Sequence, residues 1–141
     1  MQIREIFLAE KSDKIEICVH MILGLPNESE DTMMQTVRDV AALAPEQVKI
    51  HLLHIIKGTK MARLYESGEY IPLEKQEYVR LVADALELLP PDTVIARLTG
   101  DGMADTLIAP EWSRKKVSVI NDIDKELYRR GTYQGIRFNL P

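Results

Sequence analysis

Cysteine is almost missing from this chain, since Cys18 is the only one among 141 residues. A single thiol excludes an internal disulfide, and it excludes a metal site built from several cysteines of the chain itself. Proteins without disulfides are typical of reducing compartments, so we expect a cytoplasmic protein.

Long apolar runs are missing as well. Charged residues interrupt every apolar segment, so no stretch approaches the roughly 20 apolar residues that a membrane span requires. The first five residues, MQIRE, do not have the pattern of a signal peptide. Hydrophobic residues make up 45% and charged residues 28% of the chain, a balance that favours a folded domain without a membrane partner.

Several common catalytic motifs are also absent. The sequence contains no phosphate-binding loop, no Gly-x-Gly-x-x-Gly, no Gly-x-Ser-x-Gly turn and no His-Glu-x-x-His. Each of these places a nucleotide phosphate, a serine nucleophile or a zinc ion in a defined local structure. Their absence argues against a hydrolase and against an enzyme that acts on nucleotide phosphates.

Net charge is modest but unevenly distributed. The formal charge is −4, with seven Lys or Arg against four Asp or Glu from Pro110 onward, which gives +3 there and −7 before it. A basic tail of this kind could contact RNA or an acidic partner. The alternative is an exposed helix face of mixed charge.

The hydrophobic patterns predict alternating helices and strands. Strands separated by helices imply parallel pairing, and therefore a sheet covered on both faces or a barrel. The predicted strands are 15–23, 47–56 and 93–98, and the main predicted helices are 29–44, 72–89 and 112–130.

The helices are expected to pack through buried stripes. The first begins after the cap Ser29 and ends before Pro45, and the second ends at Pro90. The stretch before residue 112 and the tail after Gly131 show no periodicity. The predicted stripes are Met33, Val37, Val40, Ala41 and Ala44, then Tyr78, Leu81, Val82, Ala85 and Leu89, and finally Val117, Ile120, Ile123 and Leu127.

The first predicted strand has two different faces. Ile15, Ile17, Val19, Met21 and Leu23 make one face apolar, whereas the other face is mixed. A parallel strand buried on both faces should be apolar on both. The mixed face therefore indicates either the interior of a barrel that carries a site, or an edge strand with one face near solvent. The mixed face consists of Glu16, Cys18, His20, Ile22 and Gly24.

Two histidines lie on the second predicted strand. His51 and His54 are three residues apart, so on a continuous strand they point to opposite faces and cannot share one metal ion. His54 is nearer the carboxyl end, where parallel α/β folds carry their sites, and is the better functional candidate. A partly buried histidine with a structural role remains open, as does a metal enzyme that uses His20, His51 and His54.

The third strand ends in polar residues. Arg97, Thr99 and Asp101 bring a cation, a hydroxyl and a carboxylate to its carboxyl end, which suits the positioning of a substrate. The alternative is a tight turn in which Asp101 bonds to its own backbone. Trp112, the only tryptophan, is either a core residue or a stacking platform for a base.

Five segments together resemble radical S-adenosylmethionine (radical SAM) iron–sulfur proteins. HMILGLPNES at 20–29 resembles the fifth strand of their barrel, and VKIHLLHIIKGTK at 48–60 resembles the sixth. The remaining three are similar to an uncharacterised-oxidoreductase subfamily close to the Elp3-like group. They are RLTGDG at 97–102, LIAPEWS at 107–113 and DKEL at 124–127.

The resemblance implies a fold and a cofactor. The fold is the C-terminal part of a partial TIM-like (β/α)6 barrel, here with about three strands and a helical C-terminal extension. Residues 1–60 would form the C-terminal strands and helices of the barrel and residues 61–141 an α/β extension, or both would form one continuous domain. In the family, three cysteines hold a 4Fe–4S cluster, and an electron from it cleaves S-adenosylmethionine to a radical that abstracts hydrogen from a substrate. That cysteine loop is absent here. We therefore expect a C-terminal fragment that is inactive alone, although the full-length protein would be an enzyme.

The resemblance also implies site residues and partners. Ile22, Gly24 and His54 would contact S-adenosylmethionine, and Arg97, Thr99, Asp101 and Trp112 would contact substrate. The expected partners are the missing N-terminal half of the barrel, a reducing electron donor and tRNA, because members of the subfamily are associated with wobble-uridine modification. We expect the exposed strand edge to make the fragment a homo-oligomer. The alternative function is a non-enzymatic α/β module that binds RNA or protein.

Overall fold

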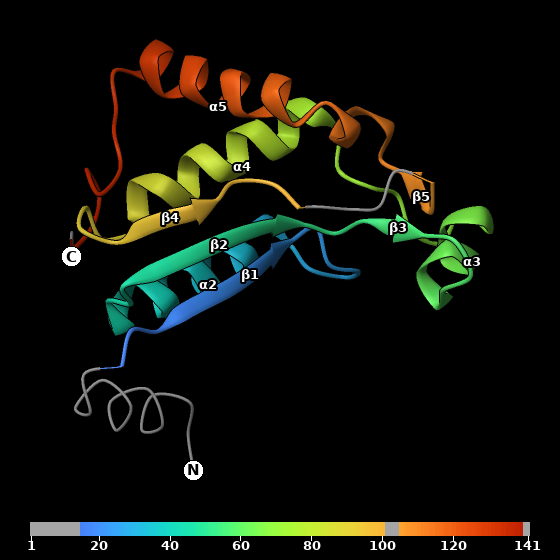
Figure 1. The fold of residues 1–141 in the computed structure, drawn as a ribbon, viewed down its shortest axis with the longest axis horizontal. Coiled ribbons are helices and arrows are strands. Elements are labelled where there is room, and N and C mark those ends of the chain that lie inside the picture. The colour runs from blue at the N-terminus through green and yellow to red at the C-terminus, as the bar shows by residue number, and fades with distance from the viewer. Residues whose placement is uncertain (1–14, 101–104, 140–141) are drawn as a thin grey trace.

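A three-stranded parallel sheet forms the centre of the computed structural model, which describes residues 15–100 and 105–139. The strands are β1 (Cys18–Leu23), β2 (Gln47–Leu52) and β4 (Val94–Arg97), in the order β1-β2-β4. Both pairs are parallel (Figure 1). The parallel pairing predicted from the alternation of strands and helices is confirmed.

A second, two-stranded sheet lies beyond the first. In it β3 (Ile55–Ile56) pairs antiparallel with β5 (Leu107–Ala109). The prediction of one strand over 47–56 is therefore wrong. The chain follows β1 as far as Leu53, whose N–H donates to the Leu23 carbonyl at 3.1 Å, and then pairs with β5 instead. The apolar run shows no break there, because both strands bury apolar side chains.

All the long helices lie on one side of the main sheet. α2 (Glu30–Leu43) and α4 (Lys75–Leu88) cover that face, and α5 (Lys116–Arg130) packs on α4 (Figure 1). α3 (Lys60–Glu66) and the 3-10 helix η1 (Glu111–Arg114) flank the smaller sheet. Of the two predicted architectures, a sheet covered on both faces is not what the described residues form.

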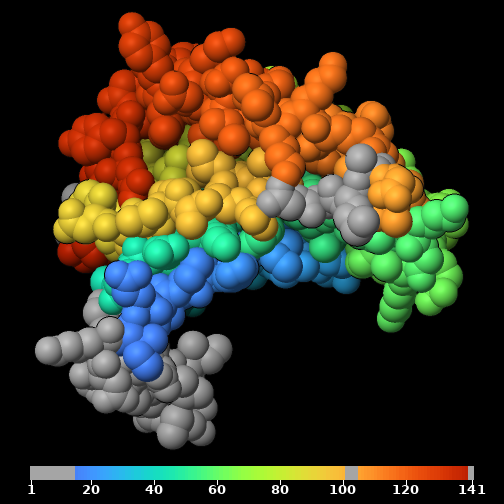
Figure 2. All heavy atoms as spheres, viewed as in Figure 1, coloured from blue at the N-terminus to red at the C-terminus, as the bar shows by residue number. Residues whose placement is uncertain are grey.

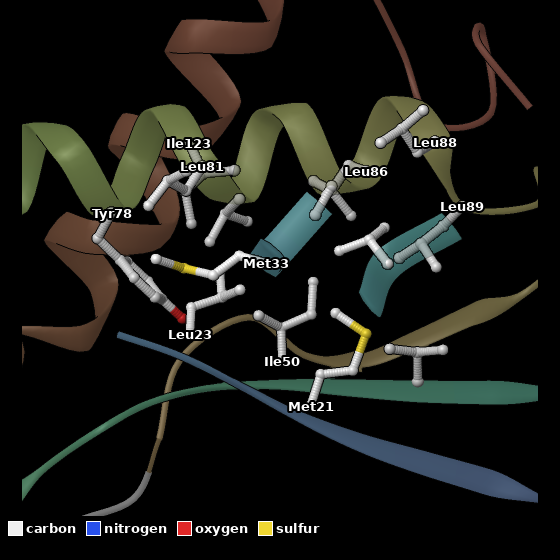
Figure 3. Close-up of a cluster of buried hydrophobic side chains, with 14 of the residues drawn as sticks. Met21, Leu23, Met33, Ile50, Tyr78, Leu81, Leu86, Leu88, Leu89 and Ile123 are labelled. Carbon is white, nitrogen blue, oxygen red and sulfur yellow. The ribbon is translucent and has the colours of Figure 1, made fainter. Parts of the chain in front are cut away.

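The main core lies between the sheet and these helices (Figure 3). Alternate residues of β1 and β2 point into it, because successive strand side chains point to opposite faces. The stripe predicted for α4 is fully buried, which confirms it. Each fully buried Leu or Ile contributes about 1.5–3 kcal/mol to folding. The strand residues in this core are Met21, Leu23, Val48, Ile50 and Leu52.

Helix α2 begins and ends nearly where the sequence predicts. The Ser29 hydroxyl accepts a hydrogen bond from the Thr32 N–H at 3.1 Å, which satisfies one of the free donors at the start of the helix. Its predicted stripe is buried apart from Ala44, which is exposed and has a left-handed backbone (φ 48°). Ala44 is therefore the C-terminal cap and not a packing residue, and Pro45 follows it.

The predicted stripe of α5 is wrong in part. Val117 is 73% exposed and Ile120 is 42% exposed, whereas Val119 and Ile123 are buried. In addition, residues 111–114 form η1, so the α-helix begins at Lys116 instead of residue 112. The row that packs on α4 is set by the partner helix, which the periodicity of one segment does not specify.

The tail after α5 is held by backbone hydrogen bonds. The Gly135 N–H donates to the Leu86 carbonyl at 3.0 Å, and the Arg137 N–H donates to the Glu87 carbonyl at 2.8 Å. Gly135 has a φ of +85°, and a Cβ there would lie 2.8 Å from Pro91. A glycine is therefore needed at this position, because both the backbone conformation and the close approach exclude a side chain. Together these contacts hold the tail against α4.

Within the described residues, no helix combines the length and apolar character of a membrane span.

The main hydrophobic cluster includes residues from both predicted parts of the chain, 1–60 and 61–141.

Candidate functional site

The face of the main sheet opposite the helices carries the polar side chains of its strands. We call it the open face. In the space-filling view, β1, β2 and β4 form a continuous surface below α5 (Figure 2). This is the face on which the sequence predicted a mixed set of side chains for the first strand. Its side chains are Cys18, His20 and Ile22 from β1, Gln47, Lys49 and His51 from β2, and Val94 and Arg97 from β4.

The strand register arranges these side chains in rows across the sheet. Cys18, Gln47 and Val94 are aligned in the first row, at the amino ends of the strands. The second row contains His20, Lys49 and Arg97, and the third pairs Ile22 with His51. The middle row thus brings three basic residues from three strands side by side.

A groove of about 460 Å³ lies on this face, toward the carboxyl ends of the strands. Parallel α/β folds place their ligands at this end of the sheet. The groove combines apolar walls with basic and imidazole groups. Its lining residues among those described are His20, Ile22, His51, Leu52, Leu53, His54, Arg97 and Gly100.

His20 and His51 form a hydrogen-bonded pair between β1 and β2. The Nδ1 of His20 lies 3.1 Å from the Nε2 of His51. The two ring planes are inclined by only 14°, and their centroids are 5.1 Å apart. Because the two nitrogens are closer than the centroids, the rings meet through these nitrogens. One nitrogen must carry a proton and the other must accept it.

The surroundings of His51 disfavour its protonated form. Burial is the main cause that lowers the pKa of His51, and the positive charges of His20, Arg97, Lys49 and His54 lower it further. Burial and, to a smaller extent, Lys116 also lower the pKa of His54. Both imidazoles are therefore neutral over a wider pH range than an exposed histidine.

His54 is held against Gly100. Its Nε2 is buried and has no hydrogen-bond partner among the described residues. A Cβ built on Gly100 would lie 3.0 Å from the Cε1 of His54 and 3.4 Å from its Nε2. The absence of a side chain at residue 100 therefore leaves room for this ring.

The predicted cofactor residues occupy two different places. Ile22 and His54 both line the groove, and Ile22 is 43% exposed. Gly24 lies in a separate hollow of about 550 Å³. Its carbonyl accepts a hydrogen bond from the Tyr70 hydroxyl, and a Cβ there would lie 3.1 Å from Leu73. The chain's own side chains therefore lie close to Gly24, and its predicted contact with S-adenosylmethionine stays a prediction.

The predicted substrate residues also separate. Arg97 lines the groove, Thr99 is buried and is not among the lining residues, and Asp101 lies outside the described residues. Trp112 donates its indole N–H to the Leu73 carbonyl at 3.1 Å and packs against Tyr78, with ring centroids 5.5 Å apart. This packing corresponds to the core alternative for Trp112 and is not a contact with the groove.

The sequence reasoning missed the pairing of His20 with His51 and the position of His51 beside His54. His51 and His54 would point to opposite faces only on an unbroken strand. Because β2 ends at Leu52, both histidines line the groove. The sequence did place His20 on the mixed face of the first strand. It did not show the register between β1 and β2, which brings His20 next to His51.

Metal binding by the histidines has little support. No group of three or more His, Cys, Asp or Glu in residues 15–100 and 105–139 could hold a metal ion. The alternative of a metal enzyme built on His20, His51 and His54 therefore lacks a ligand set in this part of the chain.

More than half of the chain matches a known protein family. Residues 45–129 match the Radical_SAM C-terminal domain. The chain is 48% identical over 121 residues to the protein YtqA of Bacillus subtilis (strain 168), covering 86% of this chain and 38% of YtqA. It therefore spans about two fifths of the length of that relative.

More distant similarity extends to two named proteins of archaea. The chain is 23% identical over 101 residues to the tRNA uridine(34) acetyltransferase of Methanocaldococcus jannaschii, covering 70% of this chain and 19% of that protein. The solved structure of Methanocaldococcus infernus Elp3, with an N-terminal deletion, superposes with a TM-score of 0.76 at 17% identity. That match covers 98% of this chain and 33% of Elp3. The superposition confirms the predicted α/β fold, which is that of the C-terminal part of a partial TIM-like (β/α)6 barrel.

Proposed function

This chain belongs to the Radical_SAM C-terminal domain family, as its motifs predicted, and from that membership we propose that it forms the cluster-free side of a radical SAM iron–sulfur oxidoreductase. The groove on the open face is the observation on which the proposal depends. It lies at the carboxyl ends of three parallel strands and brings together Ile22 and His54, which the fifth- and sixth-strand motifs assign to the nucleoside.

The residues of the groove fit a nucleoside. Ile22 and Leu53 offer apolar surface, and the buried Nε2 of His54 has no partner among the described residues. A buried polar atom of this kind gains free energy when a ligand supplies its hydrogen bond. S-adenosylmethionine carries such hydroxyl and amine groups beside a flat, largely apolar base.

The chain does not fit the iron–sulfur cluster. Its one cysteine, Cys18, is exposed on β1 at the amino end of the open face, and three thiolates are needed. We propose that the cluster is bound by residues outside this chain, in the N-terminal half of the barrel, which would pair along the edge of β1. This chain would then be inactive alone, and its exposed edge would favour association with a second copy.

The cofactors would supply reductive cleavage of S-adenosylmethionine and abstraction of hydrogen, with electrons from an external donor. This chain's residues would bind and orient the nucleoside. Ile22 and Leu53 would exclude water from one side of it, and His54 would fix its rotation by one hydrogen bond. Gly100 would keep the His54 ring in place, since it leaves the space that the ring occupies.

We propose tRNA as the substrate. One relative is named for acetylation of uridine 34 of tRNA, and this supports a nucleic-acid substrate without specifying the reaction. Arg97, on the wall of the groove, is the described residue best placed to contact it. In that case the protein would work in the cytoplasm.

The alternative of a non-enzymatic RNA-binding module has weaker support. That alternative depends on the basic residues after Pro110, and two of them form ion pairs within the protein. Arg130 forms an ion pair with Asp84 at 2.7 Å, and Arg114 forms one with Glu111 at 2.9 Å. Both pairs reduce the positive charge that the C-terminal part offers to RNA.

The decisive experiment uses the full-length protein that contains this chain. After anaerobic reconstitution and reduction, it is expected to absorb as an iron–sulfur protein and to release 5′-deoxyadenosine from S-adenosylmethionine. His54→Ala should lower the affinity for S-adenosylmethionine about tenfold, because one buried hydrogen bond is lost. Lys125→Met, on α5 and away from the groove, is the matched control and should behave as the parent.

A colourless full-length protein that leaves S-adenosylmethionine intact would refute the proposal. Full affinity in His54→Ala would refute the role of His54 alone.

A further inference from the structure

The second row of the open face is basic across its whole width. His20, Lys49 and Arg97 occupy equivalent positions on β1, β2 and β4. Positive charges that lie side by side repel one another, so this row favours a compensating negative charge.

The described residues do not supply that charge in the groove. None of the described residues that line it is an aspartate or a glutamate. Lys49 forms no ion pair within residues 15–100 and 105–139. Arg97 makes contacts of its own, and these leave the positive charge of Lys49 unchanged.

The histidine pair adds a variable charge to the same place. Because His20 and His51 meet through one nitrogen each, at 3.1 Å, the pair can share a first added proton across the two strands. A second proton would put two donors opposite each other and break the hydrogen bond. The pair can therefore change from neutral to singly positive without losing its geometry.

We propose that an oxyanion, the carboxylate or phosphate group of a small ligand, binds on the open face at the edge of the groove, between the His20–His51 pair, which lines the groove, and Lys49, which lies level with His20 on β2. The oxyanion accepts hydrogen bonds from the ammonium group of Lys49 and from the protonated pair. Binding favours the protonated pair, so it is accompanied by the uptake of a fraction of a proton from solvent, and this proton stays on the imidazoles. No bond other than hydrogen bonds is formed.

The electrostatics of His51 agree with this assignment. Burial and four basic neighbours lower the pKa of His51. A bound anion would oppose these effects and raise it. The charged and titratable groups that act on His51 are its partner His20, Lys49 from β2, Arg97 from β4 and His54 from the segment after β2, and Cys18 lies one row away on β1.

The inference rests on the proposed function only in treating this groove as a ligand site. It uses side chains of this chain, and its test needs neither S-adenosylmethionine nor a cluster. Failure of the test would therefore leave the radical SAM proposal standing, and failure of that proposal would leave the oxyanion site standing.

The test is a histidine titration of this chain by NMR between pH 5 and 8. It is run in sodium sulfate, in sodium acetate and in sodium chloride of equal ionic strength. Sulfate represents phosphate, since its charge does not change over this range, and acetate represents a carboxylate. We expect sulfate or acetate to raise the pKa of His51 by about 0.5 pH unit over chloride. By linkage, that anion binds about threefold more tightly to the protonated pair.

Two variants and a control locate the site. Lys49→Met should remove most of the anion effect on His51. His20→Asn should raise the pKa of His51 in chloride and abolish the coupled proton uptake, because the shared hydrogen bond is lost. Lys125→Met removes an equal charge on α5 and should leave the anion effect unchanged. Backbone amide spectra that match the parent confirm that each variant is folded.

The relative size of the sulfate and acetate effects assigns the oxyanion to the phosphate or the carboxylate class. Equal titration curves in all three salts would mean general screening only and would overturn the proposal. So would an anion effect that survives Lys49→Met unchanged, or one that Lys125→Met reduces as much.

Discussion

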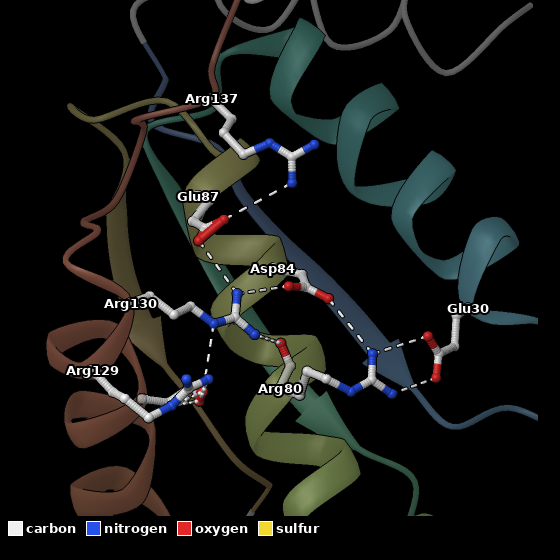
Figure 4. A network of polar contacts seen from close by, with 8 residues as sticks. Glu30, Arg80, Asp84, Glu87, Arg129, Arg130 and Arg137 are labelled. Atoms are coloured by element: carbon white, nitrogen blue, oxygen red, sulfur yellow. Dashed lines mark hydrogen bonds and ion pairs between the residues drawn. The ribbon is translucent and has the colours of Figure 1, made fainter.

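Arg130 on α5 reaches the buried carboxylate of Glu87 on α4, with 3.3 Å between Nη1 and Oε2 (Figure 4). The same nitrogen lies 2.7 Å from Oδ1 of Asp84. Glu87 is only 5% exposed, and Arg137 from the tail approaches it at 3.9 Å. This network joins α5 and the tail to α4, so the helical layer behind the groove depends on it.

Arg130→Met is expected to lower the free energy of unfolding by about 2 kcal/mol. Removing one partner of a buried ion pair leaves a desolvated charge, which generally costs 3–5 kcal/mol. The expected cost is smaller here, because Arg137 remains near Glu87 and Asp84 is partly exposed. Urea unfolding followed by circular dichroism measures the change.

The neighbouring Arg129 is the matched control. Its guanidinium is 73% exposed and pairs with Glu126 one turn earlier on the same helix. Solvent-exposed pairs of this type contribute little, so Arg129→Met should leave the unfolding midpoint nearly unchanged. Equal effects of the two substitutions would show that the network has no structural role.

The corrected phase of α5 can be tested by two valines. Val119 is fully buried and Val117 is 73% exposed. Val119→Ala should destabilise the chain by about 2 kcal/mol, through lost burial and a cavity. Val117→Ala should change stability by less than about 0.5 kcal/mol. The reverse order would restore the stripe predicted from periodicity and contradict the packing of α5 on α4.

Gly100→Ala is expected to displace the His54 ring. The new methyl group would lie 3.0 Å from Cε1 of His54, closer than van der Waals contact allows. Crowding of this kind typically costs about 1–3 kcal/mol. The NMR signals of the His54 ring should shift, whereas those of core methyl groups on α2 should not. An unchanged His54 signal would mean that the two residues are not in contact.

Stability should fall between about pH 7 and pH 5. The pKa values of His51 and His54 are lowered in the folded state, mainly by burial. As the pH falls through the ordinary histidine value of about 6.5, the unfolded chain takes up protons first, which favours unfolding. The loss ends once the pH is below the lowered folded-state values. Its slope is at most about 1.4 kcal/mol per pH unit for each histidine.

Urea midpoints at pH 7.5 and 5.5 measure this loss, and His54→Gln should reduce it. An equal loss in His54→Gln would assign the effect to other groups. Glu126 affects stability in a different pH range. Its carboxyl pKa is lowered mainly by Arg129, so its protonation changes stability only below about pH 4.5.

The sequence predicted well those elements whose pattern is local. The stripe of α4 from Tyr78 to Leu89, the cap Ser29 and the mixed face of β1 all follow from residue type and spacing within one segment. The five motifs also identified the family, because a combination of short segments is specific even where each one alone is not.

Other features depended on partners distant in the sequence. The break after Leu52 arises because Ile55 pairs with Ala109 of β5. Packing on α4 determines which residues of α5 are buried. Trp112 lies at the core because its ring packs against Tyr78 and its indole N–H donates to the Leu73 carbonyl. None of these partners is visible in the local pattern of the segment concerned.

The sequence by itself determined the fold class, the family and the mixed face of the first strand. Only the tertiary structure decided which imidazole and basic groups meet. His20 and His51 are 31 residues apart along the chain, and the parallel register of β1 and β2 brings their nitrogens to 3.1 Å. Register is fixed by packing over the whole sheet, so no single segment specifies it.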